Sequence, residues 1–384
     1  MGHSGTYRRS RSSGWMLVGV LTGALALSSS CAPESGAPSE TPAAPESTEN
    51  AAAPAEAGEA APAEAGEAAP AEAKKSKPLV IYSGRGKVLV GPLLEQFSKK
   101  TGIEVQVRYE KSTEVLANRL ATEGAQTEAD VFFAQDSGWL GALAKAGHIA
   151  PLSQELLEQI PAHYRDAGGR WVGTSGRARV LVYSSERVKT TDLPKTLDEL
   201  STGPWKGRLG WAPSNGSYQA HVSALRHIWG EEKTRKWLTA VKGLNPTVYP
   251  KNSPQVKAVS NGEIDMGWVN HYYLHKLRAA NPELKAANYS FTAAGDPGNL
   301  MMLSGVAITA HTKNQANAQA LVEFLISAAA QDYFAQKTFE YPTRAGVKLH
   351  PDVPPIGDRL VRADQTHLTD LSGTLEMLRS LGLQ

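Results

Sequence analysis

From residue 78 onward the chain alternates short apolar runs, typical of strands, with longer stretches in which apolar residues recur at helical spacing. The first series of expected strands and helices occupies residues 79–82, 89–100, 103–109, 113–123, 130–133 and 138–146. A second series occupies residues 179–183, 209–211, 231–242 and 264–269. Strands that alternate with helices form mostly parallel sheets covered by helices. The sequence therefore predicts an α/β fold with two lobes and a cleft between them.

In sheets of this kind, ligands bind beyond the carboxyl ends of the strands. The first three expected strands end near Tyr82, Tyr109 and Phe133. We therefore expect residues 83–86, Tyr109 and residues 134–135 to share one rim of the cleft.

The N-terminal segment is typical of an export signal. Arg8, Arg9 and Arg11 precede an apolar run at 15–27, which is too short to span a membrane. Small residues then lead to Cys31, the only cysteine among 384 residues. This arrangement resembles a bacterial lipoprotein signal over residues 1–30, with Cys31 as the lipidated residue. An ordinary secretory signal with an incidental cysteine is the alternative.

Residues 31–77 cannot form a hydrophobic core. The part from 32 to 73 consists of Ala, Pro, Glu, Ser, Thr, Gly and Asn and contains no aromatic residue. Its nine glutamates, without any basic residue, repel one another. We expect a disordered Ala/Pro/Glu-rich tether between the anchor and the folded body.

The folded body carries a surplus of basic residues. The signal holds three of the chain's 40 Lys and Arg residues and the tether nine of its 38 Asp and Glu residues, which leaves 37 and 29 for residues 74–384. A surplus of eight positive charges favours anionic ligands or surfaces. No basic run with interleaved aromatic residues occurs, so we do not expect nucleic-acid binding.

Motifs for several common chemistries are missing. Residues 84–86 read Gly-Arg-Gly without the third glycine of a dinucleotide site, and no P-loop or Gly-x-Ser-x-Gly sequence occurs. His271 and His275 are four residues apart but lack the glutamate of a zinc protease. We expect these two histidines at the surface or in support of other ligands, and we do not expect an enzyme.

The most informative local feature is the adjacent pair Tyr272 and Tyr273, which follows an expected strand and begins an expected helix after Asn270, a favoured cap. A phenol ionises near pH 10, so it becomes an anion at neutral pH only if a strong cation displaces its proton. Fe³⁺ is such a cation and suits phenolate oxygen. The alternative is one aromatic ring in the core and one at an interface.

A second feature favours an anion. Residues 212–217 precede an expected helix at 218–229, and a helix N-terminus offers free N–H groups and a favourable dipole. Asn252 and Arg177 lie in loops or turns that could add donors. An oxyanion held there would complete the oxygen shell of a ferric ion.

Several segments together carry a resemblance to a known family. They are residues 82–85, 102–105, 128–133, 175–183, 261–265, 270–273 and 296–300. In these segments the chain resembles the ferric-ion-binding periplasmic solute-binding proteins of ABC-type iron transporters. The resemblance covers residues 78 to about 357. It implies a two-lobed, class II periplasmic-binding-protein fold, with a cleft and hinge strands, that closes on Fe³⁺ and delivers it to an ABC-type permease.

The resemblance also implies roles for individual residues. Tyr272 and Tyr273 match the paired tyrosine ligands. The residues that match the site of a synergistic anion, carbonate or phosphate, are Asn215, Gly216, Ser217, Asn252, Asn270 and Arg177. Gly86 stands where many members have a histidine ligand, and Gln135 where some have a glutamate. Arg85 is then expected to hold the anion, and Tyr109 or Tyr82 to add a phenolate, with burial in the core as the alternative for both tyrosines.

The expected organisation is a first lobe of residues 78–178 plus 302–350 and a second lobe of residues 179–301 plus 351–384. We expect a monomer in the periplasm or at the cell surface, anchored to the membrane by lipid. The competing hypotheses are the same fold binding a phosphonate, sulfate or polyamine, and a secreted metal-dependent hydrolase.

Overall fold

The computed structural model describes residues 77–384 except residues 111, 356, 360, 363–367 and 369. The expected signal peptide at 1–30, Cys31 and the tether up to residue 76 lie outside the described residues. In the described part of the chain, no helix combines the length and the apolar character that crossing a membrane requires.

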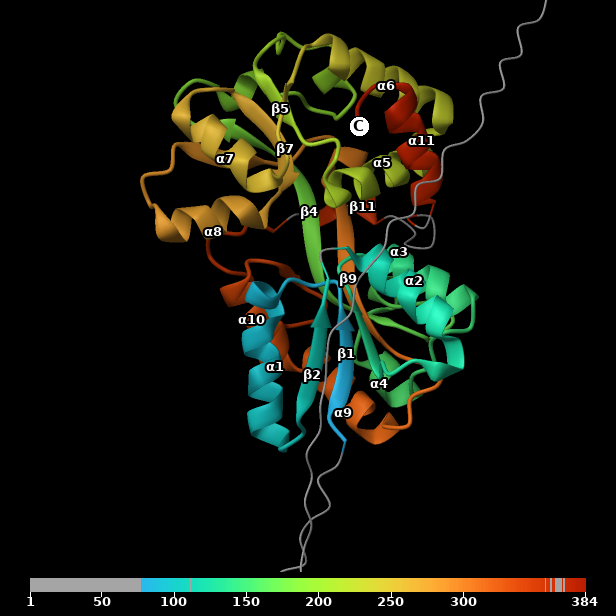
Figure 1. Ribbon diagram of the computed structural model, residues 1–384. Helices are drawn as coiled ribbons and strands as arrows, with labels where there is room; N and C mark the ends of the chain where they lie inside the picture. Colours follow the sequence, from blue (N-terminus) through green and yellow to red (C-terminus); the bar gives the residue numbers. More distant parts are fainter. Residues whose placement is uncertain (1–76, 111, 356, 360, 363–367, 369) are drawn as a thin grey trace, which may run out of the picture. The chain divides into compact units, whose positions relative to one another are not determined.

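The first lobe is built around three parallel strands. β1 (Leu79–Ser83) lies between β2 (Val105–Tyr109) and β3 (Val131–Ala134). Its helices are α1 (Lys87–Thr101), α2 (Thr113–Glu123), α3 (Ser137–Lys145), α4 (Gln154–Glu158), α9 (Gln315–Ile326) and α10 (Ala328–Lys337). Figure 1 shows α1 and α10 on one side of these strands and α2 and α3 on the other.

Both faces of this sheet are buried, as a parallel sheet requires. Leu79 and Ile81 of β1 join a core with Phe97 of α1 and Leu321 of α9. Tyr82 points to the opposite face, into a second core. Alternating residues of a strand face opposite sides, so one strand contributes to both cores.

The second lobe repeats this plan with a smaller sheet. Its strands are β5 (Leu209–Trp211), β6 (Thr247–Val248), β7 (Met266–Asn270) and β8 (Ala286–Tyr289). Its helices are α5 (Gly216–Trp229), α6 (Glu231–Gly243), α7 (Asn252–Asn261), α8 (Tyr272–Ala280) and α11 (Leu371–Ser380). Tryptophans 205, 211, 237 and 268 lie in its main core.

Two long strands run through both lobes, as Figure 1 shows. β4 (Val172–Ser184) pairs with β9 (Leu300–Ile308) up to Ala178 and with β7 from Arg179 onward. β9 also pairs with β3, so it continues the sheet of the first lobe. Strands shared in this way are where hinge motion between lobes can occur.

Short elements complete the described chain. β10 (Tyr341–Pro342) pairs with β4, and β11 (Val361–Arg362) pairs with β9. The 3₁₀ turns are η1 (Gly124–Gln126), η2 (Ala162–Tyr164), η3 (Thr190–Asp192), η4 (Glu199–Ser201), η5 (Pro297–Asn299) and η6 (Gly357–Arg359).

The strand expected at residues 179–183 is longer than predicted, because it begins at Val172. Its first half contains Gly173 and Gly176, which weaken a strand pattern in sequence. A Cβ at Gly173 would lie 2.8 Å from the carbonyl oxygen of Tyr164. The close approach of neighbouring backbone therefore explains why glycine stands inside this strand.

A buried ion pair crosses the first lobe beneath the cleft. Arg85 Nη2 lies 2.6 Å from Glu340 Oε2, and both side chains are fully buried. Arg85 Nη1 also donates to Ser304 Oγ at 2.9 Å. Burial opposes ionisation of Glu340, but Arg85 and then Arg177 outweigh burial and hold the pKa of Glu340 below its ordinary value.

Replacing Glu340 with Gln should lower the free energy of unfolding at pH 7 by about 3–5 kcal/mol, because it leaves a buried guanidinium without its counter-charge. A depressed folded-state pKa contributes stability above the unfolded value of about 4.3, which is lost as pH falls through the folded value. The difference between wild type and E340Q in urea unfolding should therefore shrink on acidification. The exposed Glu323→Gln control should change stability by less than about 0.5 kcal/mol. Equal effects of the two variants would contradict this account.

Candidate functional site

A cavity of about 690 Å³ lies between the two lobes. Its lining from the first lobe includes Gly84, Gly86, Glu110, Ser112, Glu114, Gln135, Asp136, Trp139 and Arg177. Its lining from the second lobe includes Ser214, Asn215, Gly216, Ser217, Lys251, Asn270, Tyr272 and Tyr273. The ends of β1, β2 and β3 thus meet at one rim, as the strand order predicts.

The two tyrosines lie side by side in this wall. Their ring centroids are 4.4 Å apart with an angle of 30° between the ring planes. Tyr272 is 2% exposed, whereas Tyr273 is half-buried. Burial, followed by the proximity of Tyr273, raises the pKa of Tyr272 well above its ordinary value, although Arg177 acts in the opposite direction. Tyr272 is therefore a neutral phenol at pH 7 in the ligand-free protein.

The expected cap of the tyrosine-bearing helix was wrong. Asn270 is the last residue of β7, and His271 occupies the N-cap position of α8 without a capping side-chain bond. Asn270 Oδ1 instead accepts a hydrogen bond from Arg179 Nη1 at 3.1 Å. Because its oxygen is held in this way, the amide nitrogen of Asn270 is left as a donor at the cavity wall.

Arg179 does not line the cavity but holds residues of its wall, and this role was not predicted from the sequence. Its Nη1 donates to Asn252 Oδ1 at 3.2 Å as well as to Asn270, and its Nη2 donates to the carbonyl oxygen of Trp268 at 2.5 Å. Burial lowers the pKa of Arg179 to about 9. No carboxylate among the described residues forms an ion pair with it. Arg179 and Arg177 are two residues apart on one strand, and this spacing was the available signal.

The start of α5, which was predicted to be an anion cradle, lies in the cavity wall. Asn215 occupies the N-cap, and its Oδ1 accepts from Ser217 N at 3.2 Å and from Ser217 Oγ at 2.6 Å. Asn252 Nδ2 also donates to Asn215 Oδ1 at 3.2 Å. Asn252 is therefore buried behind the cradle, whereas Asn215, Gly216 and Ser217 line the cavity itself.

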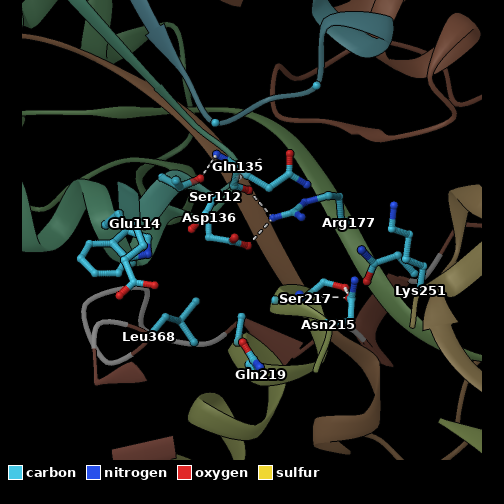
Figure 2. A pocket seen from close by; sticks show the side chains of 18 of the residues that line it. Ser112, Glu114, Gln135, Asp136, Arg177, Asn215, Ser217, Gln219, Lys251 and Leu368 are labelled. Atoms are coloured by element: carbon cyan, nitrogen blue, oxygen red, sulfur yellow. Dashed lines mark hydrogen bonds and ion pairs between the residues drawn. The ribbon is translucent and has the colours of Figure 1, made fainter. Parts of the chain in front are cut away.

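Arg177 reaches the cavity from β4. Its Nη2 donates to Asp136 Oδ1 at 2.7 Å and also to the carbonyl oxygen of Gln135. Figure 2 shows its guanidinium directed at these two residues, with Asn215 and Ser217 nearby. Burial opposes the charge, but Asp136 and Tyr272 raise the pKa of Arg177 above its ordinary value. Arg177 is thus a permanent cation at the cavity wall.

Arg85, the other arginine expected to hold the anion, lies elsewhere. It is not among the residues that line the cavity, and its side chain is fully buried in the ion pair with Glu340. It still contacts the site indirectly, because its Nη1 donates to Gln135 Oε1 at 3.1 Å. Arg85 therefore supports a cavity-lining side chain.

Tyr82 and Tyr109 are also placed apart from the cavity lining. The hydroxyl of Tyr82 donates to the carboxylate of Glu123, with a shortest distance of 2.9 Å. Tyr109 packs against the core beside α1, and burial followed by Glu95 raises the pKa of its hydroxyl. The next residue, Glu110, lines the cavity instead.

His271 and His275 are buried, so the surface position was wrong, and the other expectation, a role in support of ligands, stays a prediction. His271 Nδ1 accepts from Ala178 N at 3.2 Å, which leaves Nε2 protonated to donate to the carbonyl oxygen of Phe339 at 2.7 Å. Burial is the main reason that the pKa of each imidazole falls to about 4. His271 therefore fixes the backbone before Tyr272 against both β4 and the first lobe.

Carboxylates at the first-lobe rim were not predicted. Glu110, Glu114 and Asp136 line the cavity there, and Lys251 lines it from the second lobe. Glu110 directly follows the end of β2, and Asp136 is the second residue after the end of β3, so the rule about strand ends could have identified them. Within the described ranges, no three His, Cys, Asp or Glu side chains are grouped closely enough to hold a metal ion.

Comparison with known proteins gives consistent results. Residues 93–356 match the family described as bacterial extracellular solute-binding protein. The chain is 35% identical over 283 residues to the Fe(3+)-binding periplasmic protein of Serratia marcescens, covering 73% of this chain and 83% of the relative. It is 31% identical over 297 residues to the major ferric iron-binding protein of Neisseria meningitidis, covering 77% and 88%.

Solved structures of ferric-binding proteins have a similar fold. Iron-bound HitA from Pseudomonas aeruginosa matches with a TM-score of 0.74 and 33% identity over 80% of this chain and 99% of that one. Apo ferric ion-binding protein A from Pasteurella haemolytica matches with a TM-score of 0.74 and 26% identity over 80% and 98%. These matches confirm the two-lobed fold, and the relatives are transport proteins rather than enzymes. The chain therefore belongs to the bacterial extracellular solute-binding proteins, within the ferric-ion-binding family of periplasmic receptors for ABC-type iron transporters.

Proposed function

We propose that this chain is an iron receptor that binds Fe³⁺ through the phenolate oxygens of Tyr272 and Tyr273, together with a synergistic carbonate or phosphate. The observation that carries this proposal is the packing of the two rings 4.4 Å apart in the wall of the cavity. Adjacent phenol oxygens can bind one metal ion together. A trivalent cation provides the charge needed to displace their protons.

The surroundings of the tyrosines support a second, anionic ligand. Gly216 and Ser217 at the start of α5, Asn270 and Arg177 line the same cavity as the tyrosines. Two phenolates do not neutralise a ferric ion, and an oxyanion held by these donors supplies further charge and oxygen ligands. The functional cycle is capture in the open cleft, closure about the hinge strands, and delivery to an ABC-type permease.

Replacing Tyr272 or Tyr273 with Phe should remove one phenolate. The visible phenolate-to-iron absorption should weaken in each variant and disappear in the double variant. The affinity for iron should fall by more than the roughly 10- to 100-fold typical of losing a partner outside the coordination shell. Ferric titration in a competing chelator measures both quantities.

Tyr82→Phe and Tyr109→Phe are the matched controls, because their hydroxyls lie apart from the cavity lining. They should keep the wild-type colour and affinity. Full colour in Y272F and Y273F, or its loss in the controls, would contradict the ligand assignment.

Removing small anions should weaken iron binding. In carbonate-free buffer without phosphate, the visible absorption should be reduced, because the donors of the α5 cradle cannot bind the metal directly. Adding back carbonate or phosphate should restore the band in a saturable manner. An equally strong band in the absence of both anions would show that no synergistic anion is needed.

The same donors also support an alternative ligand, because a cradle with Arg177 could bind sulfate or a phosphonate without metal. Calorimetric titration of iron-free protein with each solute separates the two functions. Tight binding of such a solute together with no binding of Fe³⁺ would favour the alternative.

We also propose that the protein is tethered to a membrane through a lipid on Cys31 and works as a monomer in the periplasm or at the cell surface. Cys31→Ser should move the protein from the membrane fraction to the soluble fraction without changing iron binding. Immunoblotting of fractionated cells measures the first effect and ferric titration the second. A wild-type protein that is already soluble would exclude the lipid anchor.

A further inference from the structure

One ion pair at the cavity wall is not explained by the proposed function. Arg177 Nη2 lies 2.7 Å from Asp136 Oδ1, with exposures of 0% and 21% for the two side chains. Both residues line the cavity, and the carboxylate is the more exposed partner of the pair. An oxyanion that reaches Arg177 from the cavity therefore comes close to Asp136 as well.

Two of the nitrogen donors of Arg177 are not used in hydrogen bonds within the described part of the chain. Its Nε and Nη1 atoms are buried and have no hydrogen-bond partner among the residues that the structure describes. A guanidinium presents its N–H groups in a planar fork that suits carboxylate, carbonate or phosphate oxygens. However, two anions beside one guanidinium repel each other, so Asp136 and an incoming oxyanion compete.

The first turn of α3 is a second possible partner for the carboxylate of Asp136. It occupies the N-cap position of α3 with extended backbone, yet its side chain makes no capping hydrogen bond. Free N–H groups at a helix N-terminus attract a carboxylate, and capping is the usual role of Asp at this position. The Asp136 side chain can thus leave Arg177 and accept hydrogen bonds from the first turn of α3 instead.

We propose that Asp136 is a built-in competitor, which holds Arg177 in the ligand-free protein and is displaced by the synergistic oxyanion. This inference rests on the proposed anion site at Arg177. Because displacement of Asp136 costs an ion pair, an anion alone binds weakly, and the accompanying Fe³⁺ supplies the additional attraction. Asp136 therefore makes anion binding depend on iron and determines how selective the site is against free anions.

Replacing Asp136 with Asn should increase the affinity of the iron-free full-length protein for inorganic phosphate by about tenfold, since one charge-assisted hydrogen bond no longer has to be broken. Isothermal titration calorimetry on chelator-treated protein measures this affinity. The additional gain on adding Fe³⁺ should be smaller in the variant than in wild type.

Glu110→Gln is the matched control, because Glu110 lines the same cavity and the substitution removes the same charge. It should alter phosphate affinity by less than about twofold, because solvent screens an exposed charge. Equal gains in D136N and E110Q, or no gain in D136N, would overturn the proposal.

Two further variants distinguish the effect of the lost carboxylate from an effect of misfolding. Asp136→Ser keeps a capping side chain at α3 and should show the same gain as D136N. In an Arg177→Gln background, D136N should give no gain, and a persisting gain would contradict the mechanism. Failure of the proposed function can be told apart from failure of this inference. If the protein does not bind iron through tyrosines, the iron-dependent colour is missing, whatever the phosphate affinity of the variants.

Discussion

The positive charges of Arg177 and Arg179 on the hinge strand organise the cavity. The two guanidinium groups are buried where β4 changes from the sheet of the first lobe to that of the second. Arg179 holds the side chains of Asn252 and Asn270 in the second lobe, and Arg177 holds Asp136 in the first. One strand therefore sets the positions of polar groups on both sides of the cleft.

Burying these charges costs free energy of desolvation unless each is paired or hydrogen-bonded. Arg177 is paired with Asp136, whereas Arg179 donates only to neutral oxygens among the described contacts, and its buried Nε has no partner there. The positive charge of Arg177 favours the ionised form of Tyr272, although burial keeps the pKa of Tyr272 well above its ordinary value. Under the proposed function, the negative charge on these phenols forms when the cation binds.

The sequence allowed the fold to be predicted well because its lobes follow strand and helix periodicity. The strand at Leu209–Trp211 and the helix at Thr113–Glu123 have the predicted bounds. β4 was predicted too short because Gly173 and Gly176 weaken the strand pattern of its first half. A Cβ would meet the backbone of Tyr164 at Gly173 and the side chain of Met301 at Gly176, and neither contact can be read from the sequence.

The site was predicted in part, for physical reasons. Tyr272, Tyr273 and the start of α5 could be recognised because local sequence places them beside a strand end or a helix end. The partner of Arg85 could not, because Glu340 is 255 residues away and meets Arg85 only in the folded protein. The roles of Arg179 and Asp136 likewise depend on contacts between distant segments.

Under the proposed function, the phenols of Tyr272 and Tyr273 lose their protons when iron binds. Ionised tyrosine absorbs differently from neutral tyrosine in the near ultraviolet, so a difference spectrum counts the phenolates formed per metal ion. Titration of the iron-free protein with Fe³⁺ at pH 7 should show two tyrosines ionised for each ion bound. A spectrum with saturable iron binding but no tyrosine ionisation would contradict the account.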